Sequence, residues 1–448
     1  MRDIESERMG SPKIESPKAK FVYPTMRNAF ILLIVCFAAW GVAANMTDPL
    51  VKVFSKIFTM STLQAALVQF CYYGAYFCLA LPAAFINERF SYKVGVLVGL
   101  GLAIIGALSF YPASLMMAYA PFLAALFVLA AGLSILETSA NPFVMAMGPE
   151  KSATRRLNLA QSFNPVGTNI GVFLAATLIL PQLNPATAEQ RAALSSEALQ
   201  AIQAAELRAV MIPYVGMAFA LIVIWFLIAS IKVPSYAEEV GAVNELPGSA
   251  LQQTNFGATL RRLFANPLYR WGVIAQFFNV AAQTCTWTFT IQYVQEAIGG
   301  NEASAGTYLQ YSLLVFLVSR FIMTWAMGYV KPTTLLTALA LLGNVLCVYA
   351  ILSPNISGVW AVVFISACLS LLFPTIYGVA LYGLGEDTKF GAAGLVMAIL
   401  GGALLPLVQG ALLDSFGAAF SYITPALCFL IVAGYGFFTI KTARVTQI

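Results

Sequence analysis

Long apolar runs recur along the chain and are separated by short polar segments. Phe30 to Ala44 and Val94 to Leu108 are two such runs. A helix needs about 20 mainly apolar residues to cross the hydrocarbon core of a bilayer, whereas barrel strands are about 10 residues long and alternate in polarity. The runs lack that alternation. The pattern therefore predicts an all-α membrane protein of twelve membrane-spanning helices, at residues 28–50, 62–86, 92–111, 116–147, 157–181, 209–232, 268–295, 305–329, 333–352, 358–384, 390–413 and 420–441.

A polar segment at residues 233–267 divides these spans into two sets of six. It contains Pro234, Pro247 and Gly248 and a mixture of charges, which is typical of a linker. We predict a six-helix bundle over 28–232 and a second over 268–441. A cytoplasmic linker at 233–267 joins them, with cytoplasmic tails at 1–27 and 442–448.

The two sets show weak internal similarity. The loop GPEKSATRR follows the fourth span and the loop GLGEDTKFG follows the tenth, and each of these spans contains a proline, Pro142 or Pro374. Two related sets of six helices are typical of secondary transporters, which bind substrate near the midplane between the halves. The longest external segment, 182–208, is rich in Ala, Leu, Glu and Gln and predicts a short surface helix outside the membrane.

Composition agrees with a membrane location. Hydrophobic residues make up 60% of the 448 positions and charged residues only 10%, against about 25% charged residues in soluble domains. The first 27 residues are polar and charged, so we expect no cleavable signal peptide.

Positive charge alternates from loop to loop. Of the 24 Lys and Arg residues, 19 lie on the two tails and on every second loop. The positive-inside rule then places both termini in the cytoplasm, as expected for a multi-pass protein of the bacterial inner membrane. No basic patch is concentrated in one folded domain, so a nucleic-acid partner is not expected.

The seven cysteines lie in apolar runs, and the chain has no histidine. The cysteines are interpreted as small buried hydrophobic residues and not as disulfides or metal ligands. The absence of histidine argues against most enzyme chemistry, so we expect no enzyme, no metal and no cofactor. A proton relay would have to use carboxylates.

Two carboxylates lie within predicted spans, Asp48 late in the first and Glu137 well inside the fourth. Such a charge costs about 2.5–3.5 kcal/mol at the centre of a membrane helix. Asp48 could instead mark the external interface, and Glu137 could make a buried structural hydrogen bond. The functional interpretation is that both line a wet cavity and exchange protons during transport. Closing the cavity would then favour the protonated form, because loss of water disfavours charge.

Uncharged polar and aromatic residues accompany these carboxylates at helical spacing. Asn45 lies three residues before Asp48 and Trp40 eight before it, and Gln161 and Asn164 are three apart on the fifth span. The seventh span carries a stripe of Gln276, Asn279, Gln283 and Trp287. Amides can simply join helices. Together, however, amides, carboxylates and indoles match a sugar, whose hydroxyls need polar partners and whose ring stacks on indole.

Arg320 is a third charge inside a predicted span. It lies 11 residues before Lys331, which is about 16 Å along a helix. It is either a structural partner for a carboxylate or carbonyls, or a residue of binding or gating.

Several segments together resemble the fucose permeases of the major facilitator superfamily, which are bacterial sugar–proton symporters. These segments are WGVAANMTD, GLSILETSANPF, GPEKSATRRLNLAQSFN, AQFFNVAAQTCTW, SRFIMTW and LGEDTKFGAAGLVM. The resemblance extends from about residue 28 to 430. The superfamily signature between the second and third spans is present only in degenerate form, as NERFSYKVG.

The resemblance implies roles for individual residues. Asp48 is similar to an aspartate of proton coupling, and Glu137 to a glutamate whose protonation is linked to sugar binding. Asn45, Gln161 and Asn164 match polar cavity residues, and Trp40 and Trp287 match cavity aromatics. At Phe373, however, the family pattern has a tyrosine, so the cavity wall has lost a hydroxyl, although Tyr377 is one turn away.

We therefore expect a proton-coupled symporter that imports a monosaccharide, L-fucose or a related hexose, by alternating access. The proton is its coupling ion, and the chain is expected to act as a monomer. Glucose, galactose or N-acetylglucosamine are alternative sugars. A non-transporting sugar sensor and a transporter of organic anions or drugs are alternative functions. The predicted substrate-binding residues are Trp40, Asn45, Glu137, Gln161, Asn164, Gln283, Trp287 and Phe373.

Overall fold

The computed structural model describes residues 21–57, 62–116, 118–186, 190–191, 193–232 and 256–446. Within its helices, the side chains at 47–57, 62–66, 180, 210 and 443–446 lie outside the description. The part of the chain so described is helical and contains no β-strand.

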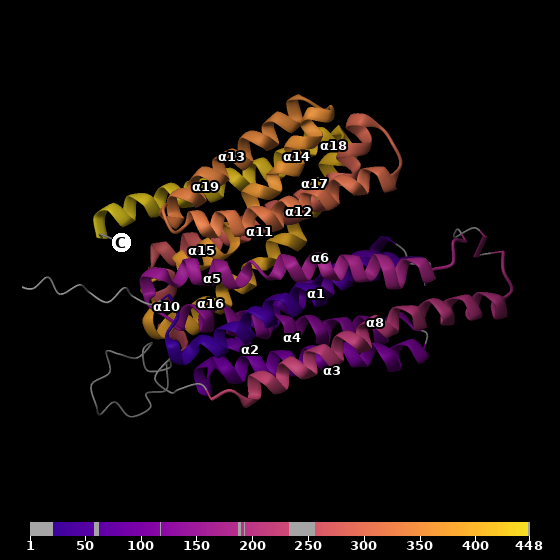
Figure 1. The fold of residues 1–448 in the computed structure, drawn as a ribbon. Coiled ribbons are helices and arrows are strands. Elements are labelled where there is room, and N and C mark those ends of the chain that lie inside the picture. Colours follow the sequence, from indigo (N-terminus) through magenta and orange to yellow (C-terminus); the bar gives the residue numbers. More distant parts are fainter. Residues whose placement is uncertain are drawn as a thin grey trace, which may run out of the picture.

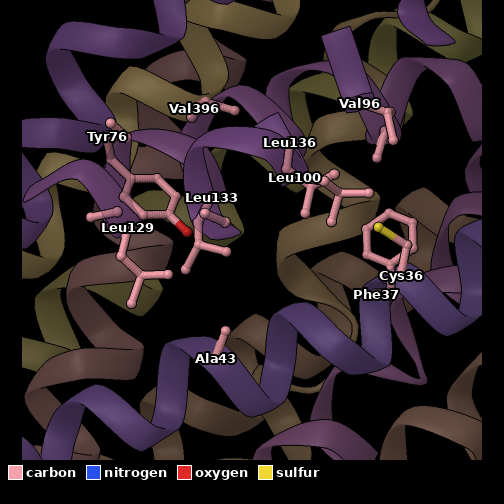
Figure 2. Packing of buried hydrophobic residues seen from close by; sticks show 14 of the residues in the cluster. Cys36, Phe37, Ala43, Tyr76, Val96, Leu100, Leu129, Leu133, Leu136 and Val396 are labelled. Atoms are coloured by element: carbon pink, nitrogen blue, oxygen red, sulfur yellow. The ribbon is translucent and has the colours of Figure 1, made fainter. Parts of the chain in front are cut away.

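The first half of the chain forms one group of helices, drawn from indigo to magenta in Figure 1. Within this group α3 packs against α4 and α8, α4 against α2, and α1 against α6. Buried apolar side chains of α1 to α4 fill its interior, as Figure 2 shows around Leu100, Leu133 and Leu136. The α-helices are α1 (Arg27–Ile57), α2 (Thr62–Arg89), α3 (Tyr92–Met116), α4 (Tyr119–Ala146), α5 (Ala153–Gln161), α6 (Asn164–Leu174) and α8 (Ser196–Ser230). Short 3₁₀ turns lie at Pro24–Met26, Glu150–Ser152 and Leu180–Gln182, and a π-helical turn at Ala175–Ile179.

The second half forms the other group, drawn in orange and yellow in Figure 1. Here α13 packs against α19 and α14, and α11 packs against α19, α17 and α12. The helices are α10 (Phe256–Ala265), α11 (Pro267–Ile298), α12 (Glu302–Ala326), α13 (Pro332–Leu352), α14 (Ile356–Leu369), α15 (Leu372–Ala380), α16 (Thr388–Met397), α17 (Gly401–Phe416), α18 (Ala418–Ser421) and α19 (Ile423–Thr446). Turns of 3₁₀ helix lie at Gly385–Asp387 and Ala398–Leu400.

The predicted fold of twelve spans in two bundles is confirmed. Eight spans are single helices, and four are interrupted by a turn, as α5–α6, α14–α15, α16–α17 and α18–α19. By length and hydropathy, eleven spans among the described residues could cross a membrane. The remaining one, α11, is 32 residues long and carries the polar stripe from Gln276 to Trp287, which lowers its hydropathy.

The structure differs from the sequence predictions at the ends of several spans. Residues 196–208 do not form a separate surface helix, because they are the first turns of the 35-residue helix α8. Alanine and glutamate favour a helix in water as well as in lipid, and no glycine or proline interrupts this stretch. The predicted linker 233–267 stays a prediction, since residues 233–255 lie outside the description; residues 256–265 form α10, and α11 begins at Pro267. Cys78 is exposed, unlike the buried position predicted for the cysteines.

Glycines bring α1 and α6 into close contact. A Cβ at Gly41 would lie 2.1 Å from the carbonyl oxygen of Asn164, and a Cβ at Gly167 would lie 1.8 Å from that of Ala38. Small residues allow such close approach of membrane helices.

Replacing Gly167 by Val is expected to lower the free energy of unfolding by about 1–3 kcal/mol, the usual cost of overpacking. The added carbons meet the backbone of α1 and cannot be accommodated by a rotamer change. Thermal unfolding of the purified protein in detergent measures the effect. Gly216→Val is the matched control, because a Cβ there meets nothing within 4 Å. Equal melting temperatures for the two variants would contradict the prediction.

The two bundles contact each other at the end where α10, α15 and α16 lie (Figure 1). There α16 packs on α2 and α4, and α15 packs on α5. The rings of Phe85, Phe256 and Phe390 form a three-membered cluster with centroids 5.1–5.4 Å apart. Arg262 on α10 donates two hydrogen bonds to Asp387, at 2.8 and 2.6 Å. Helix α10 is therefore inserted at the junction of the bundles.

Arg156 anchors the loop after α4. It is fully buried, and its guanidinium donates to the carbonyl oxygens of Val144 at 2.8 Å, Phe21 at 2.9 Å and Gly148 at 3.0 Å, and to that of Met145. These bonds hold the segment before α1 against the α4–α5 loop at the same end of the molecule.

Candidate functional site

Glu137 lies in the middle of α4, where almost every residue is buried by neighbouring helices. Its side chain is 2% exposed. Its carboxylate lies beside the amide of Asn141, one turn along the helix, and within electrostatic range of Arg320, Tyr76 and Tyr377. The carboxylate is therefore inside the protein and not on a lipid-facing surface.

A chain of hydrogen bonds leads from the neighbourhood of Glu137 to the second bundle. Gln161 donates from Nε2 to Oδ1 of Asn141 at 2.8 Å, and Arg320 donates from Nη2 to Oε1 of Gln161 at 3.0 Å. All three side chains are buried. Within the described structure Arg320 makes no ion pair with Glu137 within 4 Å, and the Gln161 and Asn141 amides lie between the two charges. One hydrogen-bonded chain thus joins α4 and α5 of the first bundle to α12 of the second.

The break between α5 and α6 positions Gln161. Gln161 is the last residue of α5, and α6 begins at Asn164 with Pro165 in its first turn. Proline supplies no backbone N–H and is favoured at the start of a helix. Gln161 therefore lies at a helix end inside the bilayer, the usual setting of binding sites in transporters with broken helices.

Trp40 is connected to the neighbourhood of Glu137 through Tyr76. Its Nε1 donates to the hydroxyl of Tyr76 at 3.1 Å, and Tyr72 donates to the same hydroxyl at 3.4 Å. Figure 2 shows Tyr76 in the packed interior beside Leu129 and Leu133. Tyr76 was not among the predicted site residues, although its i, i+4 spacing from Tyr72 indicates a shared polar face on α2.

Asn45 and Asn164 join helices in this structure. Asn45 donates from Nδ2 to Thr168 Oγ1 at 2.8 Å and to the carbonyl oxygen of Gly41 at 3.0 Å. Asn164 donates to the carbonyl oxygen of Phe37 at 3.4 Å. Both therefore act at the α1–α6 contact, the alternative role considered for amides, and both are only half-buried.

Trp287 is connected to Arg320 through one aromatic ring. Its indole lies edge-on to Phe316 at 5.1 Å, and the guanidinium of Arg320 lies 5.2 Å from the centre of that same ring. Its Nε1 donates to Ser366 Oγ at 3.1 Å. Trp287 therefore brings α11 into the neighbourhood of Arg320. Gln283, one turn earlier, is half-buried.

Phe373 lies on α15 and packs against a buried apolar cluster to which both bundles contribute. Its ring is stacked on Tyr377, with centroids 6.2 Å apart and planes at 21°. Asp48 is on α1, one turn after Asn45, but its side chain lies outside the described residues. The structure thus brings Glu137, Gln161 and Arg320 together, and leaves the place of the Asp48 carboxylate open.

Contacts between the bundles close the site on the side of α10. Ser162 and Thr324 share a hydroxyl–hydroxyl bond of 3.2 Å, and Asn158 donates to Thr375 Oγ1 at 3.3 Å. Arg155 donates to the carbonyl oxygen of Thr324 at 3.4 Å. Thr324 lies one turn beyond Arg320 on α12, so these bonds lie next to the hydrogen-bonded chain and must break if the bundles part there.

The site offers a carboxylate, amides, a guanidinium and indoles, which can bind hydroxyl groups and hold a proton. No group of three or more Asp, Glu, Cys or His residues able to bind a metal ion lies within the described ranges.

Known proteins match nearly the whole chain. Residues 29–399 match the Major Facilitator Superfamily. The L-fucose-proton symporter of Haemophilus influenzae is 39% identical over 93% of this chain and 96% of its own length. The glucose/galactose transporter of Brucella abortus is 34% identical over 91% and 93%. The crystal structure of the transporter FucP in the outward conformation is 36% identical, with a TM-score of 0.85 over 93% of this chain and 99% of that one.

Proposed function

Because the chain belongs to the Major Facilitator Superfamily, in the group of the L-fucose–proton symporters, we propose that it imports a monosaccharide together with protons. One observation carries this proposal. The buried carboxylate of Glu137 lies beside Asn141, and Asn141 is hydrogen-bonded through Gln161 to Arg320 of the other bundle. A proton can bind the Glu137 carboxylate, and the hydroxyl groups of a substrate can hydrogen-bond to the neighbouring amides and guanidinium. The relatives named above are transporters, in line with the expectation that the chain is not an enzyme.

The sugar is proposed to be L-fucose or a related hexose. The similarity to an L-fucose-proton symporter supports L-fucose as the substrate, and the similarity to a glucose/galactose transporter supports glucose or galactose. The side chain of Phe373 contains only carbon and hydrogen and cannot hydrogen-bond a sugar hydroxyl. The choice among hexoses therefore depends on the polar groups of the site.

Transport is proposed to occur by alternating access. The bundles meet at the end that carries α10, and the fold resembles a transporter in the outward conformation. Lys93, Arg155 and Lys389 lie in the first turns of α3, α5 and α16 at the same end, so the positive-inside rule makes that end cytoplasmic and places both termini there. This orientation corresponds to the bacterial inner membrane. One chain carries all the site residues, which supports a working monomer.

Asp48 and Glu137 are proposed to carry the coupled protons. Replacing Asp48 by Asn is expected to abolish accumulation driven by a proton gradient while sugar counterflow continues, because the amide cannot release a proton. Uptake of labelled sugar into proteoliposomes with and without a pH gradient measures both activities. Asp414→Asn is the matched control, since Asp414 is an exposed carboxylate on α17. Unchanged gradient-driven accumulation in Asp48→Asn would refute its coupling role.

A counterflow assay tests the proposed function as a whole. Purified protein in proteoliposomes is preloaded with L-fucose, D-galactose, D-glucose or N-acetylglucosamine, and entry of the labelled sugar is followed at two pH values. We expect exchange of at least one hexose, and a rate that depends on pH. Binding without exchange would instead indicate a sugar sensor.

A further inference from the structure

Three polar atoms near Glu137 have no hydrogen-bond partner among the described groups. They are Nδ2 of Asn141, Nε of Arg320 and the hydroxyl of Tyr377. The three residues are 0%, 4% and 0% exposed, so these atoms are closed to bulk solvent. Nearly all buried polar groups in proteins are hydrogen-bonded, and each exception calls for an explanation.

These unpartnered atoms come from both bundles. Asn141 lies on α4 of the first bundle, whereas Arg320 and Tyr377 lie on α12 and α15 of the second. The hydroxyl of Tyr377 is beside the Asn141 amide and in electrostatic range of Glu137, but it makes no hydrogen bond of good geometry. Several polar groups therefore face one region with their bonding capacity unused.

The unused groups complement the chemistry of a sugar. A carboxylate accepts hydrogen bonds, the amide Nδ2 and the guanidinium Nε donate them, and a tyrosine hydroxyl does both. Each sugar hydroxyl needs one acceptor and one or two donors, and this region supplies them within a single cluster. A protein packed only for stability would gain more from apolar side chains here than from a half-satisfied network.

Tyr377 is placed to distinguish sugars. It is stacked on Phe373, which lies one turn earlier on the same face of α15. Of this stacked pair only Tyr377 carries a hydroxyl. A sugar beside α15 would therefore contact a polar group at Tyr377 and only carbon atoms at Phe373, one helical turn away. A turn of helix is about 5.4 Å, similar to the distance between hydroxyls on opposite sides of a hexose ring.

We propose that Tyr377 is a specificity-determining residue, whose hydroxyl binds a sugar hydroxyl from the second bundle while Glu137 binds the sugar from the first. This inference rests on the proposed function and adds the residue that selects among hexoses. These groups are buried in this structure, so the sugar reaches them through a rearrangement of the bundles during the transport cycle. Binding then joins the two bundles through the substrate.

The test uses the full-length protein in proteoliposomes and three variants: Tyr377→Phe, Phe373→Tyr and the double variant Phe373→Tyr/Tyr377→Phe. Counterflow of L-fucose, D-galactose and D-glucose gives KM and the maximal rate for each sugar. We expect Tyr377→Phe to raise KM for the preferred sugar about threefold to tenfold, the effect of one lost hydrogen bond, and to raise it less for the others. The double variant moves the hydroxyl by one turn, so we expect it to change the order of preference.

Tyr329→Phe is the matched control, because that tyrosine is 77% exposed at the end of α12. A merely structural role for Tyr377 would lower the maximal rate for every sugar alike and leave the order of preference unchanged, which would overturn the proposal. If Tyr377→Phe does not fold, Phe373→Tyr alone must change the order of preference for the proposal to stand. Failure of the unmodified protein to exchange any hexose would instead refute the proposed function.

Discussion

Replacing Glu137 by Gln is expected to remove most of the pH dependence of sugar binding while the protein stays folded. The amide has nearly the shape of the carboxylic acid but cannot gain or lose a proton between pH 5 and 9. Glu137 is 2% exposed and lies beside Asn141, so an isosteric side chain keeps the packing. Binding titrations at several pH values, with intrinsic tryptophan fluorescence or calorimetry as the signal, measure the effect.

The same substitution separates binding from coupling. We expect Glu137→Gln to bind sugar as the protonated protein does, and to lose accumulation driven by a proton gradient. Glu197→Gln is the control, because Glu197 is an exposed carboxylate in the first turn of α8. If the pH dependence persisted in Glu137→Gln, the group that titrates would be another residue, and Asp48 would be the next candidate.

Replacing Arg320 by Met is the substitution with the second largest expected effect, a loss of transport of at least about tenfold. The change removes the donor of the bond that joins α12 to Gln161. It leaves Oε1 of Gln161 buried without a partner, which costs about 1–3 kcal/mol, and each 1.4 kcal/mol corresponds to a factor of ten. Counterflow rates at matched protein amounts measure the loss.

Arg320→Lys and a double variant make this prediction specific. Lysine keeps the charge but lacks the planar set of donors, so we expect an activity between that of Arg320→Met and the unmodified protein. In Arg320→Met/Glu137→Gln both charges are gone, and the combined loss should be smaller than the sum of the two single losses. Additive losses would show that the two charges do not interact.

The twelve spans could be predicted because the bilayer imposes a simple rule on the sequence. Each crossing requires about 20 apolar residues, and the short polar loops between these apolar runs can be recognised in the sequence. Hydropathy indicates which residues cross the bilayer, but it does not indicate where a helix ends in water. For this reason residues 196–208 were wrongly predicted to form a separate surface helix. There α8 extends beyond its membrane segment without any change in backbone structure.

The breaks within spans were not predicted. Pro165 and the turn at Ser370 and Leu371 mark two of them, but proline is also tolerated within the continuous membrane helices α2 and α3. Whether a helix breaks depends on whether neighbouring groups satisfy its free backbone atoms. The identity of those neighbours is a tertiary property.

The sequence by itself determined the membrane class, the number of spans and the pairs of polar residues that share one helix face. Helical periodicity acts within a single element, so Glu137 with Asn141, and Gln276 with Asn279, follow from spacing alone. Only the tertiary structure decided which faces meet. Gln161 contacts Arg320 across 159 residues of chain, and Asn45 turns to Thr168 on α6. Glycines at the α1–α6 contact and the closing contacts around α10 select these partners, and packing of that kind leaves no periodic signal in the sequence.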